Sequence, residues 1–218
     1  MPTQQQYSEN RVVAGGFFEN QTLYRMCFDY PRHDDPYVTA GKIITIGRVY
    51  SASPERKAGK AVSGGEPLLR RIARRLGETR LDEALSSIDF DARFSGKLAQ
   101  EVVDVHGLVN ATIGTAIREW NGREDESFGR ESFASKYLHF HRPNAFPILD
   151  RYSLDGVRSF FPRHRVSKLA PAGDNTVYTR FCELVLLFVE RRQVAPDWTP
   201  RSIDPALMIA GKRPNYGG

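Results

Sequence analysis

The longest regular pattern in the chain is a run of apolar residues at helical spacing from Ser95 to Trp120. These residues fall on one broad helix face: Leu98, Val102, Val105, Leu108, Val109, Ile113, Ile117 and Trp120. Apolar side chains that recur every three or four residues are typical of a helix packed on a core. Strand-type alternation never extends beyond four or five residues, and there is no internal repeat. The sequence therefore predicts a mainly α protein.

Shorter helical patterns lie on both sides of this run. They predict helices over residues 36–57, 66–76, 81–88, 128–141, 152–160, 176–193 and 202–210. The segment 142–150, RPNAFPILD, cannot be helical throughout, because proline lacks the amide hydrogen that a helix interior needs. We expect Asp150 or Ser153 to cap the helix that follows it.

Length and composition fit a soluble globular protein of one large domain or two lobes. The chain has 218 residues, of which 40% are hydrophobic, and no run of apolar residues is long enough for a membrane helix. The polar start MPTQQQYSEN lacks the pattern of a signal peptide, so we expect a cytoplasmic protein without membrane contact. The two cysteines, Cys27 and Cys182, are too few for a four-cysteine metal site and are predicted to be buried, reduced thiols.

The charge balance is consistent with a nucleic-acid partner. Lys and Arg number 31 against 26 Asp and Glu, which gives a net charge of +5, and arginine dominates the basic residues. The planar arginine side chain suits contacts to phosphate. The helix predicted over 66–76 carries Arg70, Arg71, Arg74 and Arg75 opposite its apolar face. This arginine stripe is either a solvated surface or a phosphate-binding surface.

Several familiar catalytic motifs are absent. The chain contains no GxxxxGK[ST] phosphate loop, no GxSxG elbow and no HExxH zinc helix. His139 and His141 have no neighbouring cysteine or cluster of carboxylates in the sequence. We therefore expect no metal ion and no organic cofactor.

The segment 128–152, FGRESFASKYLHFHRPNAFPILDRY, combines a lysine on a helix, a short proline-containing link and an aspartate at the start of the next helix. It resembles the active-site portion of the helix-hairpin-helix DNA glycosylases, in the bacterial branch with an 8-oxoguanine-glycosylase-like fold. The resemblance implies a mainly α, two-lobed fold with a cleft between the lobes, which would be 1–94 plus 174–218 and 95–173. It covers these residues closely and the rest of the chain only in its helical order.

The resemblance assigns roles to six residues. Asp150 takes the position of the catalytic aspartate, and Tyr152 that of a residue close to a backbone phosphate. Lys136, Arg130 and Arg151 would hold phosphate or polarise the site, Lys136 is also a candidate nucleophile, and Gly129 lies where the hairpin would contact DNA. The usual LPGVG-type hairpin is replaced by DESFGRES. An ungapped alignment places Glu131 where bifunctional members carry their Schiff-base lysine, so the resemblance implies hydrolysis without lyase activity.

The chemistry of base excision explains why an aspartate is needed. Cleavage of an N-glycosidic bond develops positive charge on the sugar, and a carboxylate can stabilise that charge while it orients the attacking water. The target base must leave the duplex and stack in a pocket. Aromatic side chains available for stacking are Phe17, Phe18, Tyr137, Phe181 and Trp198.

Two interpretations remain open at this point. The first is a monomeric, monofunctional DNA glycosylase that acts on a flipped base in double-stranded DNA, in repair or in defence against phages with modified bases. The second is a non-catalytic DNA-binding or interaction module that retains the glycosylase architecture, since a fold does not by itself imply a function. In the second case Asp150 would only cap a helix.

Overall fold

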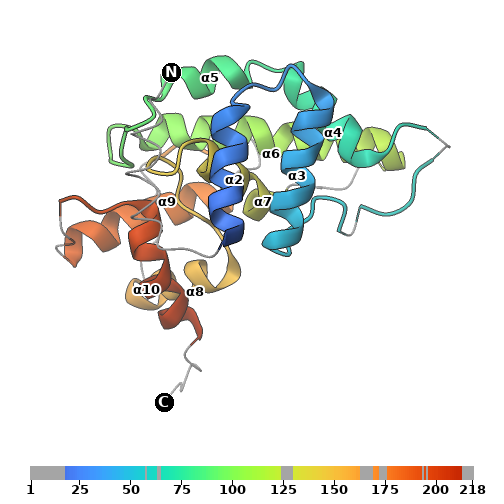
Figure 1. Cartoon of the computed structure of the whole chain (residues 1–218). Helices are drawn as coiled ribbons and strands as arrows, with labels where there is room; N and C mark the ends of the chain where they lie inside the picture. Colours follow the sequence, from blue (N-terminus) through green and yellow to red (C-terminus); the bar gives the residue numbers. More distant parts are fainter. Residues whose placement is uncertain are drawn as a thin grey trace.

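In a computed structural model the chain folds into a set of helices joined by loops (Figure 1). The structure describes residues 18–56, 58–62, 65–123, 130–162, 169–171, 176–192, 194 and 196–212, with only the backbone for residues 18 and 19. These residues form helices and no strand, which confirms the predicted mainly α class. The helices are α2 (Phe18–Asp29), α3 (Pro36–Val49), α4 (Leu68–Gly77), α5 (Leu81–Ser87), α6 (Ala99–Asn121), α7 (Glu131–His141), α8 (Arg151–Phe160), α9 (Thr176–Arg191) and α10 (Pro200–Lys212).

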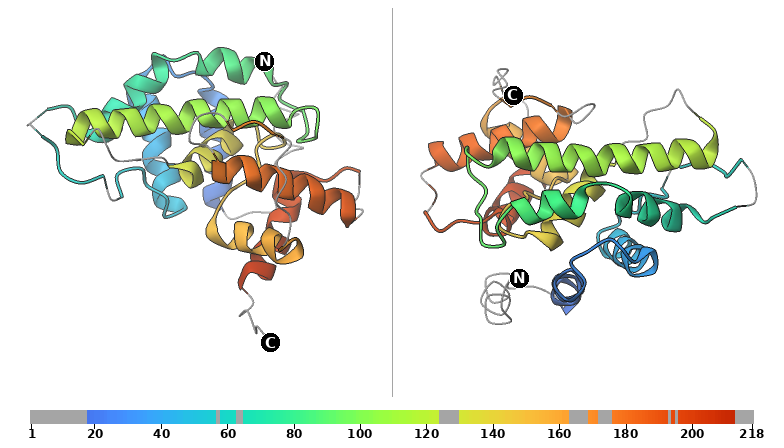
Figure 2. Two further views of the ribbon diagram at one scale, coloured as in Figure 1. Left: turned by 180° about the vertical axis from the view of Figure 1, so that it is seen from behind. Right: turned by 90° about the horizontal axis from the view of Figure 1, so that it is seen from above.

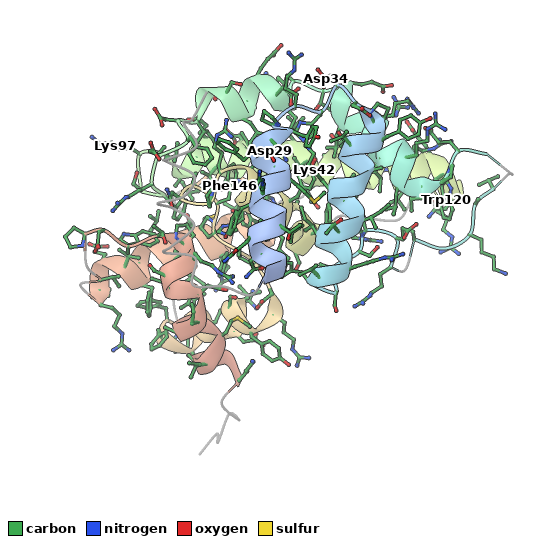
Figure 3. The ribbon with its side chains drawn as sticks, viewed as in Figure 1. Asp29, Asp34, Lys42, Lys97, Trp120 and Phe146 are labelled. Atoms are coloured by element: carbon green, nitrogen blue, oxygen red, sulfur yellow. The ribbon has the colours of Figure 1, made fainter. Side chains whose placement is uncertain are left out.

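Helix α6 is the longest helix and runs across most of the width of the molecule (Figure 2). Lys97, just before its start, and Trp120, near its end, lie at opposite sides (Figure 3). The apolar face of α6 packs against α4, α5, α7 and α9. The helix ends at Gly122, which has a left-handed φ of 70° and donates its N–H to the carbonyl of Arg118 at 2.8 Å. Glycine adopts this conformation without steric cost, and it is a common way to end a helix.

Helix α7 is the central helix of the core. Every residue from Phe133 to His141 is buried, and neighbours are supplied by α2, α3, α6 and α9. Polar side chains on such a helix need partners inside the protein, because water cannot reach them. The lysine and the two histidines of the 128–152 segment therefore lie inside the molecule.

Helices α8 and α10 form the tightest helix pair and lie below the other helices in Figure 1. Two glycines permit this approach. A Cβ atom added at Gly156 would lie 1.9 Å from the carbonyl oxygen of Leu207, and one at Gly211 would lie 2.0 Å from that of Tyr152. The start of α8 is consequently held against α10, a helix that comes 50 residues later in the chain.

The structure differs from the prediction in two elements. Helix α2 was not predicted. Its buried residues Leu23, Tyr24 and Cys27 follow helical spacing, but they cover little more than one helical turn. Helix α3 ends at Val49 instead of continuing to Lys57. Ser51 adopts a left-handed φ of 51°, and Ala52 donates its N–H to the carbonyl of Gly47 at 2.9 Å, which closes the helix.

The buried apolar side chains form one continuous cluster. It includes residues from every segment assigned to the two predicted lobes, such as Ile43, Val102, Tyr137, Phe181 and Leu207. Cys27 and Cys182 belong to this cluster as free thiols, as predicted. Among the described helices, none has the length and apolar character needed to cross a bilayer.

Candidate active site

A cavity of about 830 Å³ lies where the end of α3 and the loop after it meet the start of α7, the start of α8 and one side chain of α10. Asp150 and Lys136 both line it, as do Arg130, Arg151 and Tyr152. The structure therefore brings together all of the described residues that the sequence assigned to the site. The other lining residues are Val49, Tyr50, Ser51, Ala52, Ser53, Arg56, Glu131, Ser132, Phe133 and Met208.

Asp150 is the N-cap of α8, one of the two residues, with Ser153, that the sequence offered for this position. Its Oδ1 atom accepts hydrogen bonds from the backbone N–H of Ser153 at 2.8 Å and from the Ser153 hydroxyl at 2.9 Å. Free N–H groups and the helix dipole make a helix N-terminus a favourable place for a carboxylate. Among the described residues nothing hydrogen-bonds to the second oxygen, Oδ2, and the side chain is partly exposed at the cavity. One carboxylate oxygen is thus fixed, and the other is free to act on a ligand.

Lys136 lies within the protein at the wall of the same cavity, with only 3% of its surface exposed. Its Nζ atom donates to the Ser132 hydroxyl at 2.8 Å, to the Leu149 carbonyl at 3.0 Å and to the Ser132 carbonyl at 3.4 Å. Burial lowers the pKa of this amine, while the negative charges of Asp150 and Asp204 act in the opposite direction. Three acceptors match the three hydrogens of an ammonium group.

The backbone just before Asp150 is fixed by α7. The Leu149 N–H donates to the Ser135 hydroxyl at 3.0 Å, and its carbonyl accepts from Lys136. Both backbone groups of Leu149 are therefore held by side chains one residue apart on the same buried helix. This explains why a lysine and an aspartate separated by a proline-containing link meet at one cavity.

A second carboxyl group lies behind Asp150. Asp204 on α10 is 6% exposed, its Oδ1 atom is 3.0 Å from the Ser153 hydroxyl, and its Oδ2 atom is 3.6 Å from the Arg201 guanidinium. Burial, more than any other factor, raises the pKa of Asp204. Sequence reasoning missed this residue. The signal available was an aspartate on the buried face of α10, next to Ile203 and one turn before Leu207.

The predicted DNA-binding residues occupy different environments. Arg130 donates from its guanidinium to the carbonyls of Pro54 at 3.1 Å and Arg56 at 3.0 Å, so it holds the loop after α3, and burial lowers its pKa. Arg151 is largely exposed, with its guanidinium 3.7 Å from Asp155. Tyr152 is 44% exposed, with the Lys212 amine 5.4 Å from its ring centre. Gly129 lies outside the described residues.

The aromatic side chains at the cavity are Tyr50, Phe133 and Tyr152. Of these, the sequence had assigned only Tyr152 to the site, for a phosphate contact and not for stacking. Tyr137 and Phe181 belong to the core, and Trp198 packs edge-on against Phe94. Phe17 and the side chain of Phe18 lie outside the described part of the chain. A stacking platform in this cavity would therefore come from Tyr50, directly after α3, or from Tyr152 on α8, because Phe133 is only 1% exposed.

The arginine stripe of α4 is engaged with acidic side chains of the protein. All four of its arginines lie within 4.0 Å of a glutamate, and the acidic partners are Glu66, Glu78 and Glu119. Hydrogen bonds from Arg74 are the largest factor in lowering the pKa of Glu78. This network offsets most of the positive charge of the stripe. The finding favours a solvated surface over a phosphate-binding one.

A further cavity of about 760 Å³ lies between the end of α2, α5 and the end of α7. Four aspartates line it: Asp29, Asp82, Asp89 and Asp91. Such a wall repels phosphate, so this cavity does not suit a nucleic acid. Nor does the described part of the chain contain any group of three or more His, Cys, Asp or Glu side chains arranged to hold a metal ion.

Comparison with known protein families, with curated protein sequences and with solved structures finds no match. No comparison therefore identifies the chain as a helix-hairpin-helix glycosylase, and the resemblance of residues 128–152 to that family stays a prediction from the sequence.

Proposed function

We propose that this protein is a DNA glycosylase that hydrolyses the N-glycosidic bond of a damaged or modified base flipped into the cavity at Asp150. The proposal is carried by the hydrogen bonding and the position of the Asp150 carboxylate. Its Oδ1 atom is fixed by Ser153, no described residue hydrogen-bonds to its Oδ2 atom, and the side chain lines a cavity together with a buried lysine.

The size and lining of the cavity fit this role. A volume of about 830 Å³ is within the usual range for small-molecule sites. The partly exposed ring of Tyr50 offers a surface on which an extruded base can stack. Arg56, Arg151 and Tyr152 lie at the same cavity, so the strand on either side of the flipped nucleotide would have cationic and hydrogen-bonding contacts. The cleft would form between lobes 1–94 plus 174–218 and 95–173.

In this mechanism Asp150 is the catalytic residue. Its free oxygen stabilises the positive charge that develops on the sugar and orients the water that attacks the anomeric carbon. Lys136 acts as a charged ammonium that fixes the Leu149 carbonyl and so the position of Asp150. Because its three hydrogens are all donated, hydrolysis by water is favoured over attack by the lysine, and the product is an intact abasic site.

The first prediction tests Asp150 directly. Duplexes that carry single damaged or phage-type modified bases are incubated with the protein and then treated with alkali to cleave abasic sites. We expect excision of at least one base, and we expect Asp150→Asn to slow single-turnover excision about 10³-fold because it removes the charge. Folding should be preserved, since asparagine is as good an N-cap as aspartate.

Asp155→Asn is the matched control, because it removes an exposed carboxylate one turn further along α8. We expect this variant to excise the base at the rate of the unsubstituted protein. If the Asp150→Asn protein excised the base equally fast, Asp150 would not be catalytic. Binding of duplexes without excision of any base in the panel would instead favour a non-catalytic DNA-binding module.

A further inference from the structure

The Ser153 hydroxyl lies between two carboxyl groups. Its Oγ atom is 2.9 Å from Oδ1 of Asp150 and 3.0 Å from Oδ1 of Asp204. Ser153 is fully buried and Asp204 is nearly so. The contact between Ser153 and Asp204 therefore forms where water cannot replace either partner.

Counting hydrogens constrains the protonation of this group. A serine hydroxyl has one hydrogen to donate, and an ionised carboxylate can only accept. If both aspartates were ionised, two charged oxygens would compete for this one hydrogen. A second hydrogen, supplied by one of the two carboxyl groups, allows both contacts to be full hydrogen bonds.

The surroundings indicate which carboxyl group keeps its proton. Asp150 reaches the open cavity and accepts a backbone N–H at the start of α8, and both conditions favour its ionised form. Asp204 is shielded from water, which disfavours its ionised form, and the charge of Asp150 adds to this effect.

The remaining charged and titratable groups near Asp204 come from three elements. Arg201 on α10 and Lys136 on α7 favour its ionised form, as does the hydrogen bond from Ser153. Tyr50, which follows α3, is a further neighbour whose phenol interacts electrostatically with Asp204, and burial raises the pKa of that phenol. Burial of Asp204 outweighs the groups that favour its ionised form, so its pKa is raised.

We propose that Asp204 is a positioning residue for Asp150: as a neutral carboxylic acid it donates to the Ser153 hydroxyl, which in turn donates to Oδ1 of Asp150. The three groups form a chain in which each hydrogen points toward Asp150. Two donors from Ser153 then engage Oδ1, and the charge needed for catalysis is left on Oδ2 at the cavity. The catalytic part of this inference rests on the glycosylase function proposed above.

Ionisation of Asp204 at higher pH breaks the chain. Ser153 then has two charged acceptors for one hydrogen, and the orientation of Asp150 is no longer unique. We expect excision by the unsubstituted protein to fall on the alkaline side of its pH profile for this reason. Asp204→Asn should remove this decline, since an asparagine amide donates to Ser153 and does not titrate.

The first test requires no DNA substrate. Carboxyl carbons of the full-length protein, labelled with ¹³C, are followed by NMR as the pH is raised. We expect the side chain of Asp204 to remain protonated above the ordinary aspartate pKa of about 3.9. Titration of Asp204 at or below the ordinary value would overturn the proposal.

The second test uses the base excised most rapidly in the panel. Asp204→Asn should retain the single-turnover rate within about threefold at neutral pH, while Asp204→Ala should lower that rate at least tenfold with little change in duplex affinity. If both variants lose activity equally and keep the original pH profile, Asp204 has only a structural role and the proposal fails. If no base is excised, the NMR titration still decides the chain of hydrogen bonds, and only the glycosylase function is rejected.

Discussion

Burial determines the chemistry of individual polar side chains on α7. His139 has defined partners: its Nδ1–H donates to the Phe146 carbonyl at 3.0 Å, and its Nε2 accepts from the Tyr24 hydroxyl at 2.7 Å. This arrangement needs a neutral ring, and burial lowers the pKa of His139 to about 3. His141 is buried too, and neither of its ring nitrogens has a hydrogen-bond partner in the described residues. Burial lowers its pKa as well.

Lys136 gives the second prediction. With its hydrogens donated to Ser132 and Leu149, the amine has no lone pair available for the sugar. We therefore expect no covalent complex with DNA when borohydride is added to trap an imine during excision. Lys136→Ala should slow excision and lower the free energy of unfolding by about 1–3 kcal/mol, because it leaves buried acceptors unpaired.

The product decides this prediction. It should be an intact abasic site that is cleaved only after heat or alkali, both for the unsubstituted protein and for any activity left in Lys136→Ala. A borohydride-trapped complex that disappears in Lys136→Ala would contradict the prediction and make Lys136 the nucleophile of a bifunctional enzyme.

The buried histidines give the third prediction, on the pH dependence of stability. Below pH 6.5 the unfolded chain protonates His139 while the folded protein does not, until the pH approaches about 3. The unfolded state then binds more protons, so stability is complete above pH 6.5 and falls as the pH decreases. Between pH 6.5 and about 3, His139 alone lowers the free energy of unfolding by up to about 1.4 kcal/mol for each pH unit. His33 and His141 act in the same direction, since burial lowers their pKa too.

Urea unfolding between pH 7 and pH 5 tests this expectation. The raised pKa of Asp204 has the opposite effect on stability, because here the folded protein binds one more proton than the unfolded chain. Asp204→Asn removes this contribution. His139→Gln preserves one donor and one acceptor without titrating, so it should make the dependence less steep. A free energy of unfolding that stays constant from pH 7 to pH 5 would contradict the prediction.

At the scale of elements, the contact between α8 and α10 provides the fourth prediction. A methyl group at Gly156 would meet the backbone of Leu207, which cannot move aside as a side chain can. We expect Gly156→Ala to lower the free energy of unfolding by about 1–3 kcal/mol or to displace α10. Displacement of α10 would separate Asp204 from Ser153, so excision should fall as well.

Gly41 on α3 is the matched control for this substitution. No atom lies within 4 Å of the position that its Cβ would occupy. Gly41→Ala should therefore raise the free energy of unfolding by up to about 1 kcal/mol, as expected for alanine in a helix. Chemical denaturation of the two variants measures both effects. Equal stability of Gly156→Ala and the unsubstituted protein would show that the close contact is not needed.

The helices illustrate what a sequence can predict. Helical spacing of apolar residues identified every described helix except α2, since that pattern reports a face turned to the core. The end of α3 was not predicted, because a serine rather than a glycine adopts the left-handed conformation there. At the site, the cap at Asp150 was predictable from local sequence. Asp204 and Tyr50 were not, since they reach the site only through packing of distant segments.

At the scale of the whole molecule, the distribution of charge matters more than its total. The net charge is +5, but the four arginines of α4 face three glutamates. The cavity at Asp150 is lined by Arg56, Arg130, Arg151 and Lys136 against Glu131 and Asp150. A duplex that binds this protein should therefore approach the cavity and not α4.

The fifth prediction is that binding of a plain duplex weakens steeply with salt and that only cationic side chains near the cavity control the slope. Phosphate contacts release bound counterions, and several such contacts lower affinity about 10³-fold between 50 and 200 mM salt. Fluorescence anisotropy over this range measures the slope. Arg151→Gln should weaken binding and reduce the slope by about one, as expected for loss of one phosphate contact.

Arg74→Gln is the control, because it removes an arginine paired with Glu66 and Glu78. It should change neither the affinity for the duplex nor the salt slope. A flat salt response would point to a partner other than nucleic acid. The opposite ranking of the two variants would place the duplex on α4, because only a phosphate contact there could make the paired arginine matter more than the exposed one.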